Sequence, residues 1–92
     1  MNIDELIESV RPILEEIAFR MRMTNGNLKE ALYPMLEAHK EDMALYEEGQ
    51  EDTDIQVWLN SLCTAILLIY PKLKPNDIIE IIRDSARMEE ND

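Results

Sequence analysis

The sequence predicts an all-α protein, a compact arrangement of four helices with no sheet. The chain has only 2 Gly and 4 Pro, while the helix-favouring residues Glu, Leu, Met, Lys and Arg are abundant. No segment alternates apolar and polar residues with the period of two that is typical of strands. The 92 residues suit one domain, which we expect over residues 1–88, with a frayed acidic tail at 89–92.

The first long helix is predicted from the spacing of its apolar residues. These recur every three or four positions from Ile3 to Met21 with acids between them, and Asn25-Gly26 ends the pattern. Pro12 lies inside this stripe and removes one backbone hydrogen bond, but it does not shift the phase of the stripe. We therefore expect one kinked and continuous helix.

The second long helix is predicted to begin after Asn27, because Asn27 followed by Glu30 three residues later is a typical N-cap pattern. Its apolar stripe runs from Leu28 to Tyr46, and Gly49 ends it. Pro34 lies inside this stripe, again without a change of phase. A kinked but continuous helix is expected here too.

Two further helices complete the predicted fold. Thr53 followed by Gln56 matches a Thr-x-x-Gln capping box, and the third helix must end near Tyr70-Pro71 because proline disfavours a helical predecessor. A short fourth helix of about 12 residues is expected to start at Lys74-Pro75. It is too short to cover the third helix along its whole length.

The third helix carries an unusual amount of apolar surface. Its 16 residues from Ile55 to Tyr70 contain no charge, in a chain that is 32% charged. This run is shorter than the roughly 20 residues of a membrane span. Its apolar arc is roughly 200° wide, whereas a surface helix commonly shows about 100°. We therefore expect the arc to serve self-association as a homodimer or small closed oligomer, with Val57, Leu67 and Leu68 at the contact, and full burial within the monomer is the alternative.

Charge indicates which partners the chain excludes and which it accepts. The formal net charge is −11, and residues 41–54 hold seven acids and no base. Such a field repels phosphate backbones and anionic lipid, so we expect neither nucleic acid nor membrane as a partner. A protein with a basic surface remains, and the candidate binding residues are Glu47, Glu48, Glu51, Asp52 and Asp54. The alternative is a solvated helix end that only keeps the protein soluble.

The sequence offers little for catalysis, and we expect no catalytic residue, cofactor or metal. Glu47-Glu48-x-x-Glu51 has the spacing seen in all-helical nucleotide pyrophosphohydrolases, which bind magnesium through helix-borne carboxylates. However, Gly49 interrupts the motif, and only Glu89 and Asp92 offer a second acidic pair. The predicted function is therefore a non-enzymatic interaction module: an adaptor, assembly chaperone or inhibitor. A small magnesium-dependent enzyme of the pyrophosphohydrolase kind is the alternative.

The remaining reactive or adaptable side chains are expected to be structural. His39 lies on an apolar stripe and is interpreted as a hydrogen-bonded core or boundary histidine, and Cys63 as a small buried hydrophobe. The methionines of the first two helices either pack in the core or line a groove for a partner helix: Met21, Met35 and Met43. A single cysteine and an acidic N-terminus without a signal peptide indicate a cytoplasmic protein.

Overall fold

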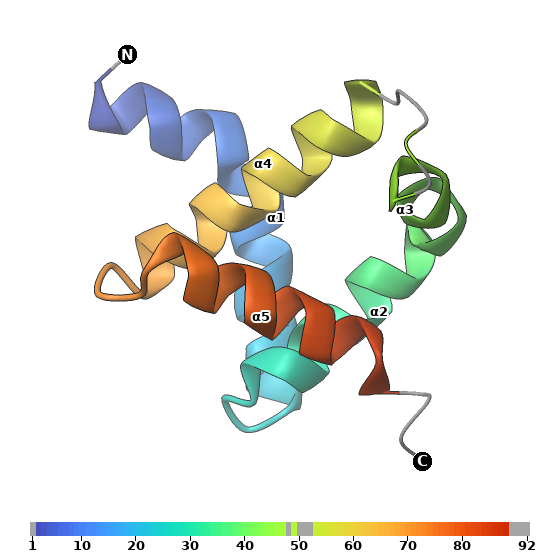
Figure 1. Cartoon of the computed structure of the whole chain (residues 1–92). Coiled ribbons are helices and arrows are strands. Elements are labelled where there is room, and N and C mark those ends of the chain that lie inside the picture. Colours follow the sequence, from blue (N-terminus) through green and yellow to red (C-terminus); the bar gives the residue numbers. More distant parts are fainter. Residues whose placement is uncertain (1, 48, 50–52, 89–92) are drawn as a thin grey trace.

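The computed structural model describes residues 2–47, 49 and 53–88, and within these ranges it contains helices and no strand (Figure 1). The predicted all-α class is confirmed. The predicted tail at 89–92 lies outside the described residues. In chain order the helices are α1 (Ile3–Met23), α2 (Leu28–Ala38), α3 (Lys40–Glu47), α4 (Thr53–Ile69) and α5 (Pro75–Ala86).

Helix α1 runs unbroken through Pro12, as predicted. Its start is capped by Asn2, whose Oδ1 accepts a hydrogen bond from the backbone N–H of Glu5 at 2.9 Å. The chain leaves the helix through Asn25 and Gly26, which both have a positive φ (55° and 82°). Figure 1 shows that α1 bends between its N-terminal turns and the rest, in keeping with the hydrogen bond that Pro12 removes.

The second predicted helix begins as expected but is two helices in the structure. The Oδ1 of Asn27 accepts a hydrogen bond from the backbone N–H of Glu30 at 3.1 Å, and α2 remains helical through Pro34. The chain then turns at His39, and α3 begins at the next residue. The expected continuous helix to Tyr46 is corrected accordingly, so the described residues form five helices where four were expected.

Tertiary packing accounts for the turn at His39. The imidazole of His39 lies against the indole of Trp58 on α4, with ring centroids 4.0 Å apart. The carbonyl of His39 accepts a hydrogen bond from the backbone N–H of Met43 at 3.0 Å, which starts α3 in a new direction. Because of this turn, α3 packs against α4 and Met43 reaches the core. These contacts override a local pattern that favours one long helix.

The end of α4 and the start of α5 are as predicted, whereas Thr53, the expected N-cap, is the first residue of α4 itself. Helix α4 stops at Ile69, directly before Tyr70 and Pro71. Helix α5 starts with Pro75, where the missing proline N–H costs nothing because a first-turn N–H has no partner within the helix. The carboxylate of Asp77 accepts a hydrogen bond from the backbone N–H of Lys74 at 3.1 Å, which fixes the entry to α5.

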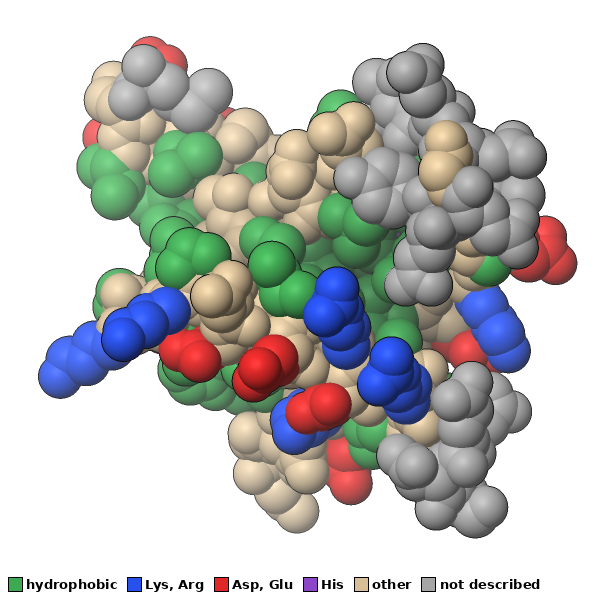
Figure 2. Space-filling model, viewed as in Figure 1, with side chains coloured by type: hydrophobic (Ala, Val, Ile, Leu, Met, Phe, Trp, Pro, Cys, Tyr) green, Lys and Arg blue, Asp and Glu red, His purple; other side chains and the backbone are tan. Residues whose placement is uncertain are grey.

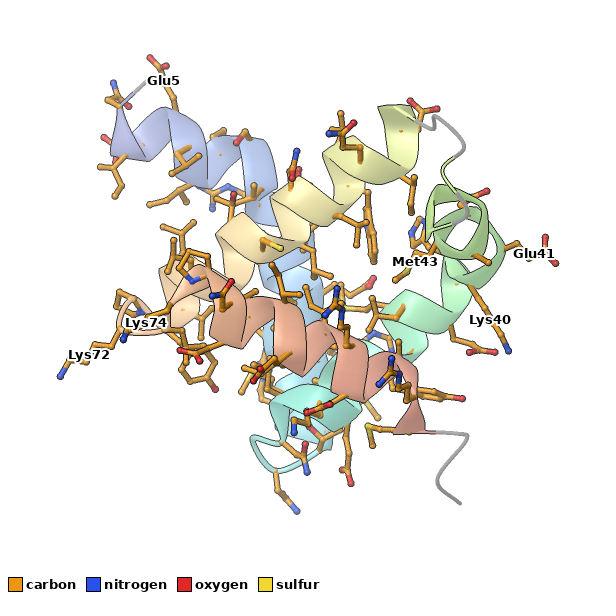
Figure 3. The ribbon with its side chains drawn as sticks, viewed as in Figure 1. Glu5, Lys40, Glu41, Met43, Lys72 and Lys74 are labelled. Carbon is orange, nitrogen blue, oxygen red and sulfur yellow. The ribbon has the colours of Figure 1, made fainter. Side chains whose placement is uncertain are left out.

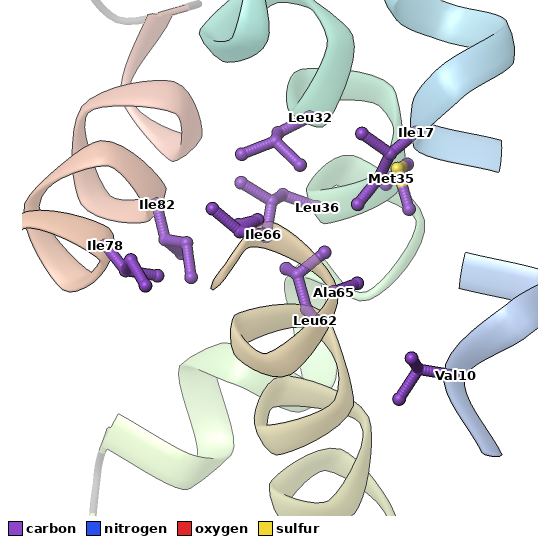
Figure 4. Packing of buried hydrophobic residues seen from close by; sticks show 10 residues of the cluster. All are labelled: Val10, Ile17, Leu32, Met35, Leu36, Leu62, Ala65, Ile66, Ile78 and Ile82. Atoms are coloured by element: carbon purple, nitrogen blue, oxygen red, sulfur yellow. The ribbon is translucent and has the colours of Figure 1, made fainter. Parts of the chain in front are cut away.

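The core lies between four of the five helices. The most extensive contacts pair α2 with α5 and α1 with α4, and α1 also packs on α2 (Figure 1). Figure 4 shows buried apolar side chains from these four helices pointing into one space: Val10, Ile17, Leu32, Met35, Leu36, Leu62, Ala65, Ile66, Ile78 and Ile82. Each fully buried aliphatic side chain stabilises the fold by about 1.5–3 kcal/mol relative to its exposed state.

Three methionines of the first two predicted helices, Met21, Met35 and Met43, contribute to this core, whereas Met23 is exposed. Met35 is buried, and Met21 and Met43 are half-buried and pack against the buried cluster. They therefore fill space between helices within the monomer, and Met35 also borders a small hollow beside Pro12 and Pro34.

Three neighbours cover the apolar arc of α4. Helices α1, α5 and α3 all contact it, and Ile55, Leu62 and Ile66 are buried as a result. The cover is incomplete, because Val57 and Leu67 on the opposite side stay exposed. Of the described helices, none combines the length and apolarity that crossing a membrane requires.

Candidate interaction surfaces

Acidic side chains lie on α3 and at the start of α4. Glu41 and Asp42 lie in the first turn of α3 and Asp54 in the first turn of α4, and all three are exposed. Helices α3 and α4 are in contact, so the three acids lie on the same side of the molecule. Figure 3 shows Glu41 pointing away from the body of the protein. We call the acidic segment of residues 41–54 the acidic corner; the structure describes its residues 41–47, 49, 53 and 54.

The three described acidic side chains of this segment are not neutralised locally. Within the described ranges, Glu41, Asp42 and Asp54 have no ion pair. The neighbouring base, Lys40, is already paired with Glu37 at 3.9 Å. The negative potential of the corner is therefore open to solvent and to a positively charged partner.

The five predicted binding residues are only partly placed. Asp54 is exposed on α4, and Glu47 ends α3. The other three candidates lie outside the described residues: Glu48, Glu51 and Asp52. The described part of this segment also exposes Glu41 and Asp42, which were not among the five predicted binding residues. Their signal in the sequence was the base-free run of acids itself.

The predicted self-association residues divide into two groups. Val57 is 57% exposed and Leu67 is 41% exposed, so both present apolar surface to solvent. Leu68 is half-buried and packs against the core. Helix geometry places Leu68 on the same side of α4 as Val57, so its partial burial depends on a neighbouring helix that packs against that flank.

A second group of exposed apolar side chains lies on α1. Phe19 is 55% exposed and Met23 is 72% exposed, and their spacing of four residues puts them on one face. Ile3 at the start of the same helix is also exposed, although its place on the predicted stripe had indicated burial. The pair Phe19 and Met23 was detectable in the sequence, because both residues fall off the apolar stripe of the helix.

A hollow of about 200 Å³ lies beside the two helix-interior prolines, Pro12 and Pro34. Its wall includes Glu16 and Arg20 of α1, whose facing atoms, Oε2 and Nε, are 3.7 Å apart. That distance allows an ion pair but is too long for a hydrogen bond, and neither buried atom has a hydrogen-bond partner. The negative charge of Glu16 and the positive charge of Arg20 offset each other, so this wall of the hollow has little net charge.

The rings of His39 and Trp58 form the other side of this hollow. They are tilted by 31° and lie in van der Waals contact. His39 is half-buried, which agrees with its interpretation as a boundary histidine, and its contact is aromatic packing. The pair closes the space between the α2–α3 turn and α4.

Nucleophiles and metal ligands are sparse in the described part of the chain. Among these residues no three of His, Cys, Asp and Glu come together in a way that could hold a metal ion. Cys63 is half-buried against the core, and burial raises the pKa of its thiol, which disfavours the reactive thiolate. The proposed pyrophosphohydrolase motif and its second acidic pair fall mostly outside the described residues: Glu48, Glu51, Glu89 and Asp92.

Figure 2 shows where apolar and charged side chains lie on one face of the molecule. Hydrophobic side chains gather along the N-terminal end of α1 and in the trough between α4 and α5, and basic and acidic side chains line α5 below. The trough is bordered by the same helix, α4, that carries the exposed Val57 and Leu67.

Three comparisons, with protein-family models, with curated proteins and with solved structures, each found no match to this chain. The assignment of a function therefore rests on the surfaces of the chain itself.

Proposed function

We propose that this chain is a non-enzymatic protein-interaction module, an adaptor, assembly chaperone or inhibitor, which docks through its acidic corner on a basic surface of a larger protein. The observation that carries the proposal is the group of exposed and unpaired acids Glu41, Asp42 and Asp54 in the acidic corner. They border a segment in which residues 41–54 hold seven acids and no base. Attraction to a basic surface would guide and accelerate association.

Helix stability explains only some of these acids. Glu41, Asp42 and Asp54 occupy first turns, where a negative charge interacts favourably with the helix dipole. Glu47 ends α3, where the same dipole disfavours a negative charge. An acid in that place lowers helix stability, so capping does not account for it, and a role at the surface, in binding or in solubility, is required.

The proposed setting of this interaction is the cytoplasm. One half-buried cysteine, Cys63, suits a reducing compartment, where thiols remain unpaired. A basic partner in that compartment would meet the corner at moderate ionic strength, at which attraction between charges still extends about 8–10 Å.

Magnesium separates this proposal from the enzyme alternative. A carboxylate site that binds the metal only in the folded state raises the melting temperature, and the stabilisation grows with the logarithm of the metal concentration above its Kd. We expect millimolar magnesium to leave the melting temperature of this chain unchanged relative to a monovalent salt of equal ionic strength. A rise of several degrees that only magnesium produces would instead favour the pyrophosphohydrolase-like enzyme.

Affinity capture with two matched variants tests the docking surface. A corner variant replaces five acids by amides: Glu47→Gln, Glu48→Gln, Glu51→Gln, Asp52→Asn and Asp54→Asn. A control variant neutralises five exposed acids elsewhere: Asp4→Asn, Glu8→Gln, Glu15→Gln, Glu30→Gln and Glu80→Gln. The two variants have the same net charge, and the corner variant keeps Glu41 and Asp42, which support the start of α3.

A basic protein recovered with the wild-type chain and the control variant, and lost with the corner variant, supports the proposal. Equal recovery by all three chains at low and high salt would contradict it. The acids of the corner would then serve solubility alone.

A further inference from the structure

The outward side of α4 carries a symmetrical row of side chains. Val57, Asn60, Thr64 and Leu67 follow one another at steps of three, four and three residues, so they lie along one side of the helix, opposite the buried Leu62 and Ile66. We call these four residues the α4 row. Its sequence of apolar, polar, polar and apolar side chains reads the same in both directions about the level of Leu62.

Such a row is complementary to a copy of itself that runs the opposite way. In an antiparallel pair centred at Leu62, Val57 of one copy faces Leu67 of the other, and Asn60 faces Thr64. Both apolar residues then gain an apolar partner, at two points about 15 Å apart along the helix by the rise of 1.5 Å per residue. An interface that uses the same patch on both copies closes on itself as a two-fold dimer.

The middle of the row suits close approach of two helices. The hydroxyl of Thr64 already donates to the carbonyl of Asn60 at 2.9 Å within α4. It can therefore be covered by a second helix without leaving its donor unsatisfied. Its methyl group and the amide of Asn60 remain for contact across the pair.

Opposite charges at the two ends of α4 favour an antiparallel over a parallel pair of helices. Asp54 lies in the first turn, while Lys72 and Lys74 follow the last turn, and within the described ranges none of the three has an ion pair. Figure 3 shows Lys72 and Lys74 at the end of the molecule opposite Glu41 and the acidic corner. A parallel pair would bring the two acidic corners together, in a chain with a net charge of −11. An antiparallel pair brings the lysines of one copy toward Asp54 of the other.

We infer that the occupant of the exposed α4 face is a second copy of this chain, which pairs α4 with α4 antiparallel about a two-fold axis at the level of Leu62. This inference goes beyond the proposed function and does not depend on it. Glu41 and Asp42 lie on α3, outside the α4 row, and Figure 3 shows Glu41 pointing outward. The dimer therefore leaves these acids accessible and presents two acidic corners to partners.

Sedimentation of single and double variants tests both the dimer and its direction. At tens of micromolar, the wild-type chain is expected at twice its mass of 10.8 kDa. Val57→Lys alone and Leu67→Glu alone each place an unpaired charge against an apolar side chain, so each should sediment as a monomer. The double variant Val57→Lys/Leu67→Glu should recover the dimer, because the antiparallel register sets each introduced lysine against the introduced glutamate of the other copy.

Matched controls come from α1. Phe19→Lys and Met23→Glu make the same kinds of change at similarly exposed apolar positions, and both should remain dimeric. Circular dichroism of every variant checks that the helices are intact. A monomeric wild-type chain, or single variants that stay dimeric, would overturn the inference. Folded single variants that are monomers, with a double variant that is also a monomer, would overturn the antiparallel register.

Discussion

Ser85 links α5 to α2 through its hydroxyl group. It is the only polar residue among those described that is fully buried, and its Oγ donates a hydrogen bond to the backbone carbonyl of Lys29. Beside it, the ammonium of Lys29 pairs with the carboxylate of Asp84 at 3.1 Å. Because that ion pair is half-exposed, it contributes little, and the buried hydroxyl is the stronger polar link between α2 and α5.

Removal of this hydroxyl should destabilise the protein measurably. Ser85→Ala deletes a buried donor and leaves the carbonyl of Lys29 with one acceptor site unused, at a cost of about 1 kcal/mol in the free energy of unfolding. The matched control is Ser9→Ala, because Ser9 also donates to a carbonyl, that of Leu6 at 2.7 Å, but at an exposed site. Urea denaturation should show a loss for Ser85→Ala and almost none for Ser9→Ala. Equal midpoints for the two variants would contradict this role for Ser85.

The burial or exposure of single residues could be predicted from the sequence in some cases and not in others. The exposure of Val57 follows from its place on the polar side of a regular helix, so it could be predicted from spacing alone. The burial of Ser85 could not, since its partner is 56 residues away in the chain. Leu68 lies between these cases, because which flank of the α4 arc is covered depends on where α1 and α5 pack.

At the scale of elements, some helix boundaries are determined by neighbouring residues in the sequence and others by residues distant in the sequence. The starts of α2 and α5 and the end of α1 depend on neighbouring residues such as Asn27, Pro75 and Gly26, and the sequence predicted all three. The turn at His39 depends on Trp58, 19 positions later in the sequence, and on the burial of Met43. Local pattern alone therefore favoured one helix where packing makes two.

The contact between His39 and Trp58 should hold the α2–α3 turn against α4. His39→Ala removes the ring that lies on the indole, so the free energy of unfolding should fall by about 1 kcal/mol, the usual contribution of an aromatic pair. Trp58 is the only tryptophan, so its emission reports the change directly, with a shift to longer wavelength as the indole gains solvent. His39→Phe keeps an aromatic ring and should retain most of the stability. Emission and stability unchanged in His39→Ala would contradict a structural role for this contact.

For the whole molecule, the packed core and the charged surface have separate roles. The buried cluster from α1, α2, α4 and α5 is closed, and the functional proposals therefore concern the outside of the helices. The sequence could predict the existence of an acidic run at 41–54 but not its neighbours in space. The contact between α3 and α4 places the helix that carries Glu41 and Asp42 against the helix that begins near Asp54, and this contact depends on the turn at His39.

The central claim, docking through the acidic corner, is tested most directly by the rate of association with the captured basic partner as salt is varied. The wild-type rate constant should fall as salt is added, because screening shortens the range of attraction. The corner variant should associate more slowly at low salt, approach the wild-type rate at high salt, and bind at least about tenfold more weakly at low salt, roughly 1.4 kcal/mol. The control variant should keep most of the wild-type salt dependence. Identical rate constants for the wild-type chain and the corner variant from low to high salt would contradict the claim.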